Sequence, residues 1–203
     1  VYFTGAGKEH AIYTAKAADK YLQEIEAFLD YDIMDKLQFV VFNSQSAFRQ
    51  SNIGLRNDES TNIGGIARVD GNKIFIFYEG DHDKLDRQIR SGIASIVVHK
   101  LMYGDNWKDA LKSSTILTFP DWFINGFTDY MAGDWTTEID NKVKDGVLTG
   151  SYDKFNRLEG ENSRLAGYAL WNYIDEVYGK KMIPNILYMT RVSRNVESGY
   201  MYV

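Results

Sequence analysis

Apolar residues recur along the chain at two spacings, one typical of helices and one typical of strands. Where they return every three or four positions, they predict an amphipathic helix. This helical spacing covers residues 7–31, 85–103, 121–132, 164–179 and 182–194. The spacing therefore predicts helices over about two fifths of the chain.

The remaining segments predict strands, a hairpin and loops. Residues 1–4 and 36–44 are rich in β-branched and aromatic side chains, as strands are. We expect a hairpin over 64–78, because Asp70-Gly71 suits a tight turn with positive φ. The polar segments are expected to form loops, with a short helix as the alternative in the first of them. They cover residues 45–62 and 140–162.

The order of these elements predicts an α+β fold with a small mixed sheet. A strand, a helix, a second strand and a hairpin precede a series of helices. We expect one domain over residues 1–203, with an α/β lobe over 1–104 and a mainly helical lobe over 105–203. The 44% of hydrophobic residues can supply its core. The final residues, 198–203, carry no helix stop or polar tail, so we expect the chain to be a fragment of a longer protein.

Composition and charge narrow the classes of function. The formal net charge is -5 and the sequence has no basic stripe, which argues against sequence-independent binding to nucleic acid. No apolar run approaches the ~20 residues that a transmembrane helix needs. The chain contains no cysteine, which excludes thiol catalysis, disulfides and cysteine-ligated zinc.

The helix over 85–103 carries the residues that point to chemistry. His99 lies beside its apolar face, where a histidine usually packs in a core. Lys100 falls between the directions of Ile89 and Ile93, and a lysine is rarely buried without a polar partner. The next helix carries Asn125 and Asp129 four residues apart on one face. Gly126 beside them permits a close approach between helices.

The most specific segment is "FPDWFINGFTDYMAGDW", residues 119–135. Together with the element order and the histidine on the preceding helix, it resembles the motif P-x-W-[FL]-x-E-G-[FL]-x-x-Y of the gluzincin metallopeptidases, specifically the peptidase MA-like group. The resemblance covers nearly the whole chain and implies a zincin-like fold. In that family an H-E-x-x-H helix supplies two zinc ligands and the general base. The glutamate of the next helix is the third ligand, and an aspartate four residues later orients the first histidine.

Transferred to this sequence, the family pattern is degenerate at the metal site. His99 matches the first ligand and Asp129 the orienting aspartate. Lys100 stands at the position of the general base, Tyr103 at that of the second histidine and Asn125 at that of the ligand glutamate. We therefore expect no zinc, no other cofactor and no catalytic residue.

Two geometric expectations follow from this correspondence. His99 should lie within hydrogen-bonding reach of Asp129, and the carboxylate should raise the pKa of the imidazole. Lys100 should reach a carboxylate, a backbone carbonyl or solvent, because an unpaired buried ammonium is too costly.

The resemblance also implies a binding surface. In the family a cleft-edge strand pairs with extended peptide, and "KIFIFY" is the candidate for that strand, with a fully buried strand as the alternative. Its proposed ligand-binding residues are Ile74, Phe75, Ile76, Phe77 and Tyr78. The expected partners are an extended peptide, a protein or a glycan, and further domains of the same chain such as a TolB-like β-propeller. The implied location is periplasmic or secreted.

The sequence thus predicts a catalytically inactive peptidase-like domain, a pseudopeptidase that serves as a recognition or scaffolding module. The first alternative is an active hydrolase, either with an atypical metal set or with a carboxylate pair such as Asp121 and Asp129. The second alternative is a purely structural domain without a ligand.

Overall fold

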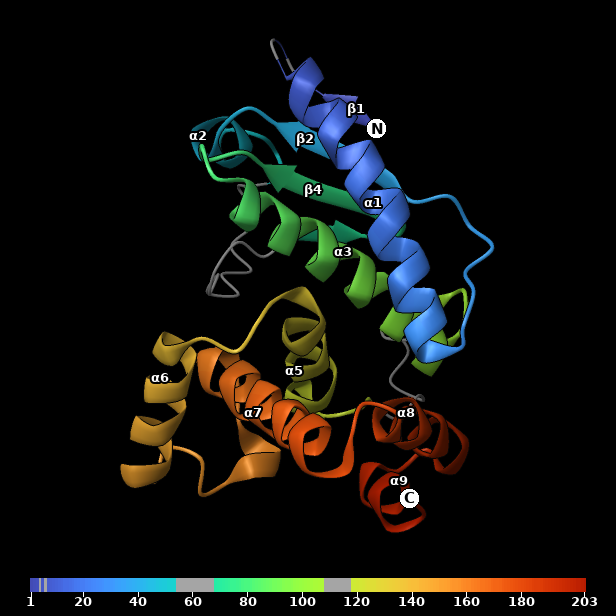
Figure 1. The fold of residues 1–203 in the computed structure, drawn as a ribbon, viewed down its shortest axis with the longest axis vertical. Coiled ribbons are helices and arrows are strands. Elements are labelled where there is room, and N and C mark those ends of the chain that lie inside the picture. The colour runs from blue at the N-terminus through green and yellow to red at the C-terminus, as the bar shows by residue number, and fades with distance from the viewer. Residues whose placement is uncertain (4, 6, 54–67, 108–117) are drawn as a thin grey trace.

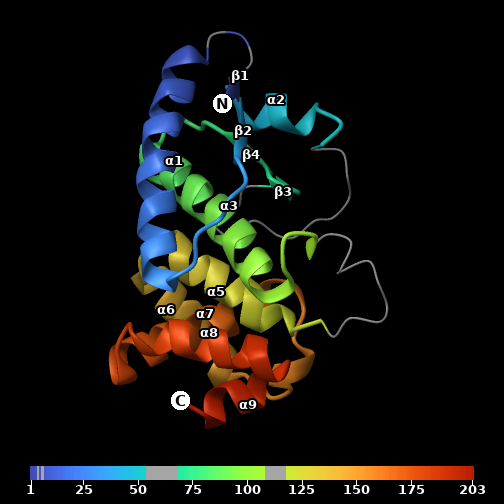
Figure 2. The same cartoon turned by 90° about the vertical axis from the view of Figure 1, so that its right-hand side faces the viewer.

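The chain folds into an α/β lobe packed on a helical lobe (Figure 1). The computed structural model describes residues 1–3, 5, 7–53, 68–107 and 118–203. Figure 2 shows the same arrangement from the side, with the sheet at one end of the molecule and helices α5 to α9 at the other. The structure is a mixed α+β fold that is mostly helical, as the element order predicts.

The α/β lobe contains a four-stranded mixed sheet in the order β1-β2-β4-β3. Strands β1 (Tyr2–Phe3), β2 (Gln38–Phe42) and β4 (Lys73–Phe77) run parallel, and β3 (Arg68–Asp70) pairs antiparallel with β4. The predicted hairpin is confirmed where it is described: Asp70 pairs with Lys73, and Gly71 turns the chain with a φ of 63°. Residues 64–67 of the expected hairpin lie outside the described residues.

Helices cover both faces of this sheet. Helices α1 (Lys8–Leu29) and α3 (His82–Tyr103) pack against each other and against one face, where Ile74 and Ile76 are fully buried. The short helix α2 (Gln45–Arg49) lies on the other face, where Phe48 packs against Phe42, Phe75 and Phe77. Side chains of β4 therefore alternate between two apolar layers.

The helical lobe contains α5 (Asp121–Ala132), α6 (Thr137–Leu148), the 3-10 turn η1 (Phe155–Arg157), α7 (Gly160–Tyr178), α8 (Met182–Ser193) and α9 (Val196–Met201). Helices α5 and α7 cross where Gly126 meets Gly167. A Cβ built on Gly167 would lie 1.9 Å from the carbonyl oxygen of Trp122, so only glycine fits there. The close approach expected at Gly126 is confirmed, with α7 as the partner helix.

One continuous hydrophobic core runs through both lobes. It contains Ile25 of α1, Ile96 of α3, Phe123 of α5, Trp171 of α7 and Leu187 of α8, each nearly or fully buried. Trp171 also donates a hydrogen bond from Nε1 to the carbonyl of Phe123, at 3.0 Å. The two lobes therefore share their interior.

One prediction about secondary structure was wrong. The segment 140–162 was expected to be a loop, but α6 extends into it and η1 follows. Thr136 caps α6 by accepting a hydrogen bond from the amide of Ile139, and the helix is mostly polar, with Gly146 as its one buried residue. The final residues, for which no element was predicted, form a further helix, α9 (Val196–Met201), whose cap is the side chain of Asn195.

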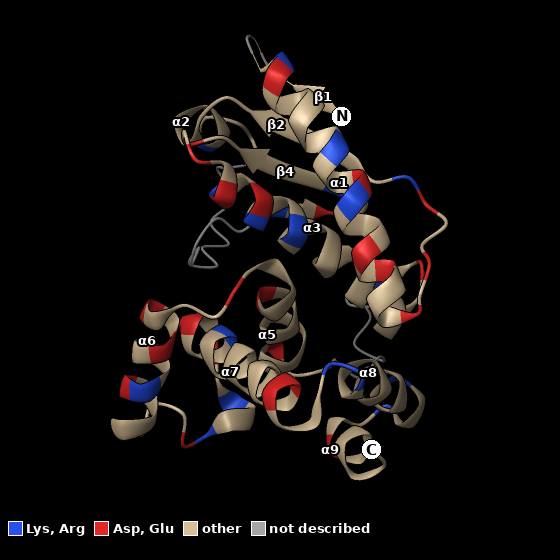
Figure 3. Ribbon diagram, in the orientation of Figure 1, with Lys and Arg blue, Asp and Glu red and all other residues tan. Residues whose placement is uncertain are grey.

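Acidic and basic side chains are interspersed on the helices of both lobes (Figure 3). Among the described residues, no helix is long and apolar enough to cross a membrane.

Candidate functional site

The positions that the family resemblance assigns to a metal site lie on α3 and α5, which run antiparallel past each other. Tyr103, at the end of α3, accepts a hydrogen bond at its hydroxyl from the amide of Phe119, just before α5 begins, at 3.0 Å. At the other end, the side chain of Arg87 on α3 lies against Gly133, which follows α5. The structure thus brings the helix that carries His99 against the helix that carries Asn125 and Asp129.

His99 is held by its own helix and by aromatic rings. Its Nδ1 lies 2.6 Å from the carbonyl of Ser95, so Nδ1 carries the proton and donates to that oxygen. The ring centroid lies 4.7 Å from that of Trp107 and 6.1 Å from that of Tyr103. Burial lowers the pKa of His99, and the hydrogen bond to Ser95 only partly opposes this shift. The imidazole is therefore neutral near pH 7, with Nε2 as its one available lone pair.

The expected contact between His99 and Asp129 is absent, and that prediction was wrong. Asp129 accepts two hydrogen bonds from Arg164 on α7, one from Nε at 2.7 Å and one from Nη2. Both side chains are largely buried. No hydrogen bond joins His99 to Asp129 among the described residues, and the pKa of the imidazole is lowered by burial rather than raised by this carboxylate. A bidentate guanidinium satisfies the carboxylate better than an imidazole, because it supplies a charge and two parallel donors.

Lys100 is buried to 1% exposure and forms ion pairs, as expected. Its Nζ lies 2.5 Å from Asp35 Oδ2, in the loop between α1 and β2, and 3.2 Å from Asp105 Oδ1, just after α3. Burial by itself would lower the pKa of Lys100, but the two carboxylates raise it above its ordinary value. Lys100 also lowers the pKa of Asp35. The lysine is thus a permanent cation that joins two loops.

Tyr103 and Asn125 are the last two of the positions that the family resemblance assigns to the metal site. Burial raises the pKa of Tyr103, so its phenol is neutral at physiological pH and is a weak metal ligand. The Tyr103 ring also packs on Phe119, with centroids 5.5 Å apart. Asn125 is half-buried on α5 and offers a neutral amide. Catalytic zinc requires about three good protein donors, and these positions supply one imidazole. The residues present do not fit a zinc ion.

In the described part of the chain, no group of three or more histidine, aspartate or glutamate side chains could hold an ion. The alternative carboxylate pair also fails. Asp121 and Asp129 are eight residues apart on α5, or about 12 Å along the axis at 1.5 Å per residue. Paired hydrolytic carboxylates lie about 5–9.5 Å apart, and Asp129 is bound to Arg164.

The expected cleft-edge strand is an interior strand, and that prediction is corrected. Strand β4 pairs with β2 on one side and with β3 on the other, so it cannot add a peptide strand. The side chains of Ile74, Phe75, Ile76 and Phe77 are all buried. Tyr78, after the strand, stacks on His10 with ring centroids 3.9 Å apart. In the described sheet, β3 is the strand at the edge next to β4.

Sequence patterns missed the partners that hold the site together. Asp35 and Arg164 determine where Lys100 and Asp129 point, yet they lie 65 and 35 residues away along the chain. Gln88 was also missed: it is buried on α3 and exchanges two hydrogen bonds with the backbone of Phe77, at 2.8 and 2.9 Å. No local pattern identifies these pairs, since each partner alone looks like an ordinary polar residue.

No protein-family model matches the sequence, and no curated protein or solved structure shows significant similarity to it.

Proposed function

We propose that this chain is a catalytically inactive, gluzincin-like domain that serves as a recognition or scaffolding module. The observation that carries the proposal is the pair of crossing helices α3 and α5. His99 offers one neutral imidazole there, while the family's other metal and base positions hold an ion-paired lysine, a neutral phenol and an amide. The antiparallel edge strand β3 and the helical second lobe also support a zincin-like fold.

The lysine is the strongest argument against hydrolysis at this site. A metallopeptidase needs a carboxylate beside the metal-bound water to accept its proton. Lys100 is a cation that already uses its donors on Asp35 and Asp105. It therefore cannot act as a base, and its charge would repel a dication.

The same resemblance supports a periplasmic or secreted location and a place beside further domains, such as a β-propeller, in a longer chain. The gluzincin-like module would then position or recognise a ligand for that assembly. A purely structural domain is the competing function, and it predicts no ligand on any face.

Metal content tests this function directly. The purified protein should contain no stoichiometric zinc by elemental analysis, and added zinc should leave its melting temperature unchanged, because an ion stabilises only a native state that binds it. His82→Ala is the matched control for incidental binding, since His82 is an exposed histidine at the other end of α3. One equivalent of zinc that is lost in His99→Ala and kept in His82→Ala would overturn the proposal.

A gain of zinc binding tests the correspondence between the helices. Replacing Tyr103 by histidine and Asn125 by glutamate adds two donors beside His99, while Lys100 keeps its ion pairs. The double variant should bind zinc more tightly than the wild type, and removing His99 from it should abolish the gain. A folded double variant without any gain would show that these helices do not correspond to those of the gluzincins.

A further inference from the structure

A second candidate site lies on the opposite side of α3 from His99. A cleft of about 360 Å³ opens between the two lobes, and Arg90 lines it from α3. Arg90 precedes His99 by nine residues, which places the two side chains about half a turn apart around the helix. The cleft is thus separate from the degenerate metal positions, and its volume is within the usual range of small-molecule sites, about 300–1,000 Å³.

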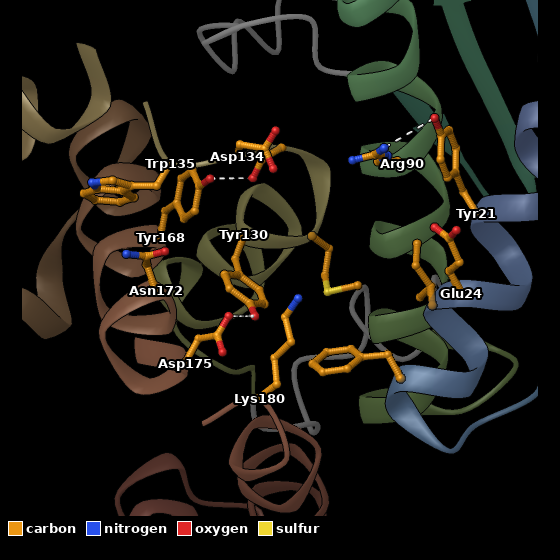
Figure 4. Close-up of a pocket in the computed structure, with 14 residues that line it drawn as sticks. Tyr21, Glu24, Arg90, Tyr130, Asp134, Trp135, Tyr168, Asn172, Asp175 and Lys180 are labelled. Carbon is orange, nitrogen blue, oxygen red and sulfur yellow. Dashed lines mark hydrogen bonds between the residues drawn. The ribbon is translucent and has the colours of Figure 1, made fainter. Parts of the chain in front are cut away.

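Charged side chains of both signs line each side of the cleft. The α/β lobe contributes Glu24 from α1 and Arg90 from α3, and the helical lobe contributes Asp134, Asp175 and Lys180. Figure 4 shows these residues projecting from both lobes around one space. Two cations and three carboxylates leave the cleft nearly neutral, so it offers hydrogen-bond donors and acceptors without a strong preference for a charged ligand.

Several of these polar groups are held in place before any ligand arrives. The guanidinium of Arg90 lies over the ring of Tyr21, 4.4 Å from its centroid, and donates from Nη2 to the Tyr21 hydroxyl at 3.4 Å. Tyr130 donates its hydroxyl hydrogen to Asp175 at 2.7 Å. Side chains fixed by their neighbours lose little entropy when a ligand binds, so such a cleft is preorganised.

Aromatic rings supply the apolar part of the cleft. Trp135 is half-buried and packs edge-on against Tyr168, with centroids 5.1 Å apart, and Tyr168 donates to the carbonyl of Gly133 at 2.6 Å. These contacts hold the Trp135 ring beside Tyr168 in the lining of the cleft (Figure 4). A fixed indole face is a suitable surface for the C–H face of a sugar ring.

We propose that this cleft between the lobes binds a neutral carbohydrate. Each sugar hydroxyl both donates and accepts a hydrogen bond, which matches the mixture of carboxylates, cations and the Asn172 amide. The sugar ring would pack on Trp135. This inference rests on the proposed recognition role and identifies the ligand class and the site.

Other ligand classes fit the cleft less well. A peptide that binds by strand addition needs the edge of a sheet, whereas helices and the connection at 133–135 form the lining of this cleft. A polyanion requires an excess of cations, and a metal or an organic cation requires carboxylates free of nearby Arg and Lys. Arg90 and Lys180 oppose the three carboxylates here.

The test is direct binding to defined oligosaccharides. The probes are maltotriose, cellotriose and N-acetylchitotriose, followed by an array of neutral and sialylated glycans, with trialanine and inorganic phosphate as competing classes. Binding is measured by calorimetry and by the shift of the Trp135 indole N–H resonance, assigned with Trp135→Phe. We expect at least one neutral glycan to bind and to shift that resonance.

Variants then locate the site. Asp134→Asn and Lys180→Met should each weaken binding by about tenfold, the effect of losing one hydrogen bond to a charged group. Lys181→Met is the matched control, because Lys181 is an exposed neighbour of Lys180 that does not line the cleft. Its affinity should equal that of the wild type. All three substitutions change exposed side chains, so the fold is retained and checked by circular dichroism.

Each other outcome rejects the site or the ligand class. The proposal is overturned if no glycan of the array binds, or if Asp134→Asn and Lys180→Met leave the binding unchanged. Trialanine or phosphate shifting the Trp135 resonance in place of glycans overturns the carbohydrate assignment. The zinc measurement is independent of the glycan measurement. A protein that holds zinc and binds a glycan rejects only the proposal of an inactive peptidase. A protein that holds no zinc and binds no glycan rejects only the carbohydrate site.

Discussion

Replacing Arg164 by methionine probes the ion pair that joins α5 to α7. Arg164 donates two hydrogen bonds to Asp129, and the two side chains are 9% and 17% exposed. Methionine has a similar length and no charge, so the variant keeps much of the packing and leaves the carboxylate without its partner. The experiment decides whether Asp129 is a structural group or an orienting group for His99.

The expected loss of stability is large. Breaking a buried pair by removing one partner costs about 3–5 kcal/mol in the free energy of unfolding, because the other charge stays buried. For a chain of this size that corresponds to a fall of about 6–20 °C in melting temperature. The double variant Asp129→Asn/Arg164→Met removes both charges. It should be more stable than the sum of the single losses predicts, by at least about 1.5 kcal/mol.

The loss should depend on pH in a definite direction. Burial raises the pKa of Asp129, although Arg164 opposes this shift, and without Arg164 the pKa rises further. The native state then binds the carboxyl proton more tightly than the unfolded state, where the pKa is about 3.9. The cost of Arg164→Met is therefore smallest below about pH 4 and grows as pH rises through the raised native pKa.

Urea unfolding at pH 4.5 and pH 7, followed by tryptophan fluorescence, measures these quantities. Arg157→Met is the matched control, because Arg157 is an exposed arginine of the same lobe, and it should change stability little. A loss below about 1 kcal/mol for Arg164→Met, or strictly additive effects in the double variant, would refute the buried pair. A shift of the His99 imidazole resonances in Asp129→Asn but not in Arg164→Met would instead place the carboxylate beside the histidine.

Two further predictions concern the helix crossing and His99. Gly167→Ala should lower the free energy of unfolding by at least about 3 kcal/mol, because its Cβ would lie 1.9 Å from the Trp122 carbonyl oxygen. Gly80→Ala, with open space and a φ of 81°, should lower it by only about 1–2 kcal/mol. Urea unfolding compares the two variants, and equal losses of stability would contradict the close crossing of α5 and α7. Because burial lowers the pKa of His99, the native state binds fewer protons than the unfolded state, and the free energy of unfolding should fall as pH drops below about 6.5. His99→Gln should reduce this loss of stability at low pH, and His82→Gln should not. An NMR titration that places the pKa of His99 above 6.5 would contradict the lowered pKa.

The sequence by itself determined the local structure of most of the molecule. Apolar residues at helical spacing located α1, α3, α5, α7 and α8, and Asp70-Gly71 located the hairpin turn. Local pattern suffices there because each long helix must bury one continuous stripe and a tight turn needs a residue that tolerates positive φ. The sequence of α6 did not suffice, because that helix is mostly polar and Gly146 is its one buried residue. The buried lysine was likewise expected to reach a carboxylate, a backbone carbonyl or solvent, and Lys100 pairs with two carboxylates.

Only the tertiary structure decided which groups meet. The sequence placed Asp129 on the correct helix, but packing of α7 turned it toward Arg164 and left His99 to bond with Ser95. The tertiary structure also placed β4 in the interior of the sheet. The cleft between the lobes assembles Glu24, Arg90 and Lys180 from distant parts of the chain. Periodicity specifies which face of an element is buried, whereas the choice of polar partner depends on how helices and strands far apart in sequence are packed, which no local pattern encodes.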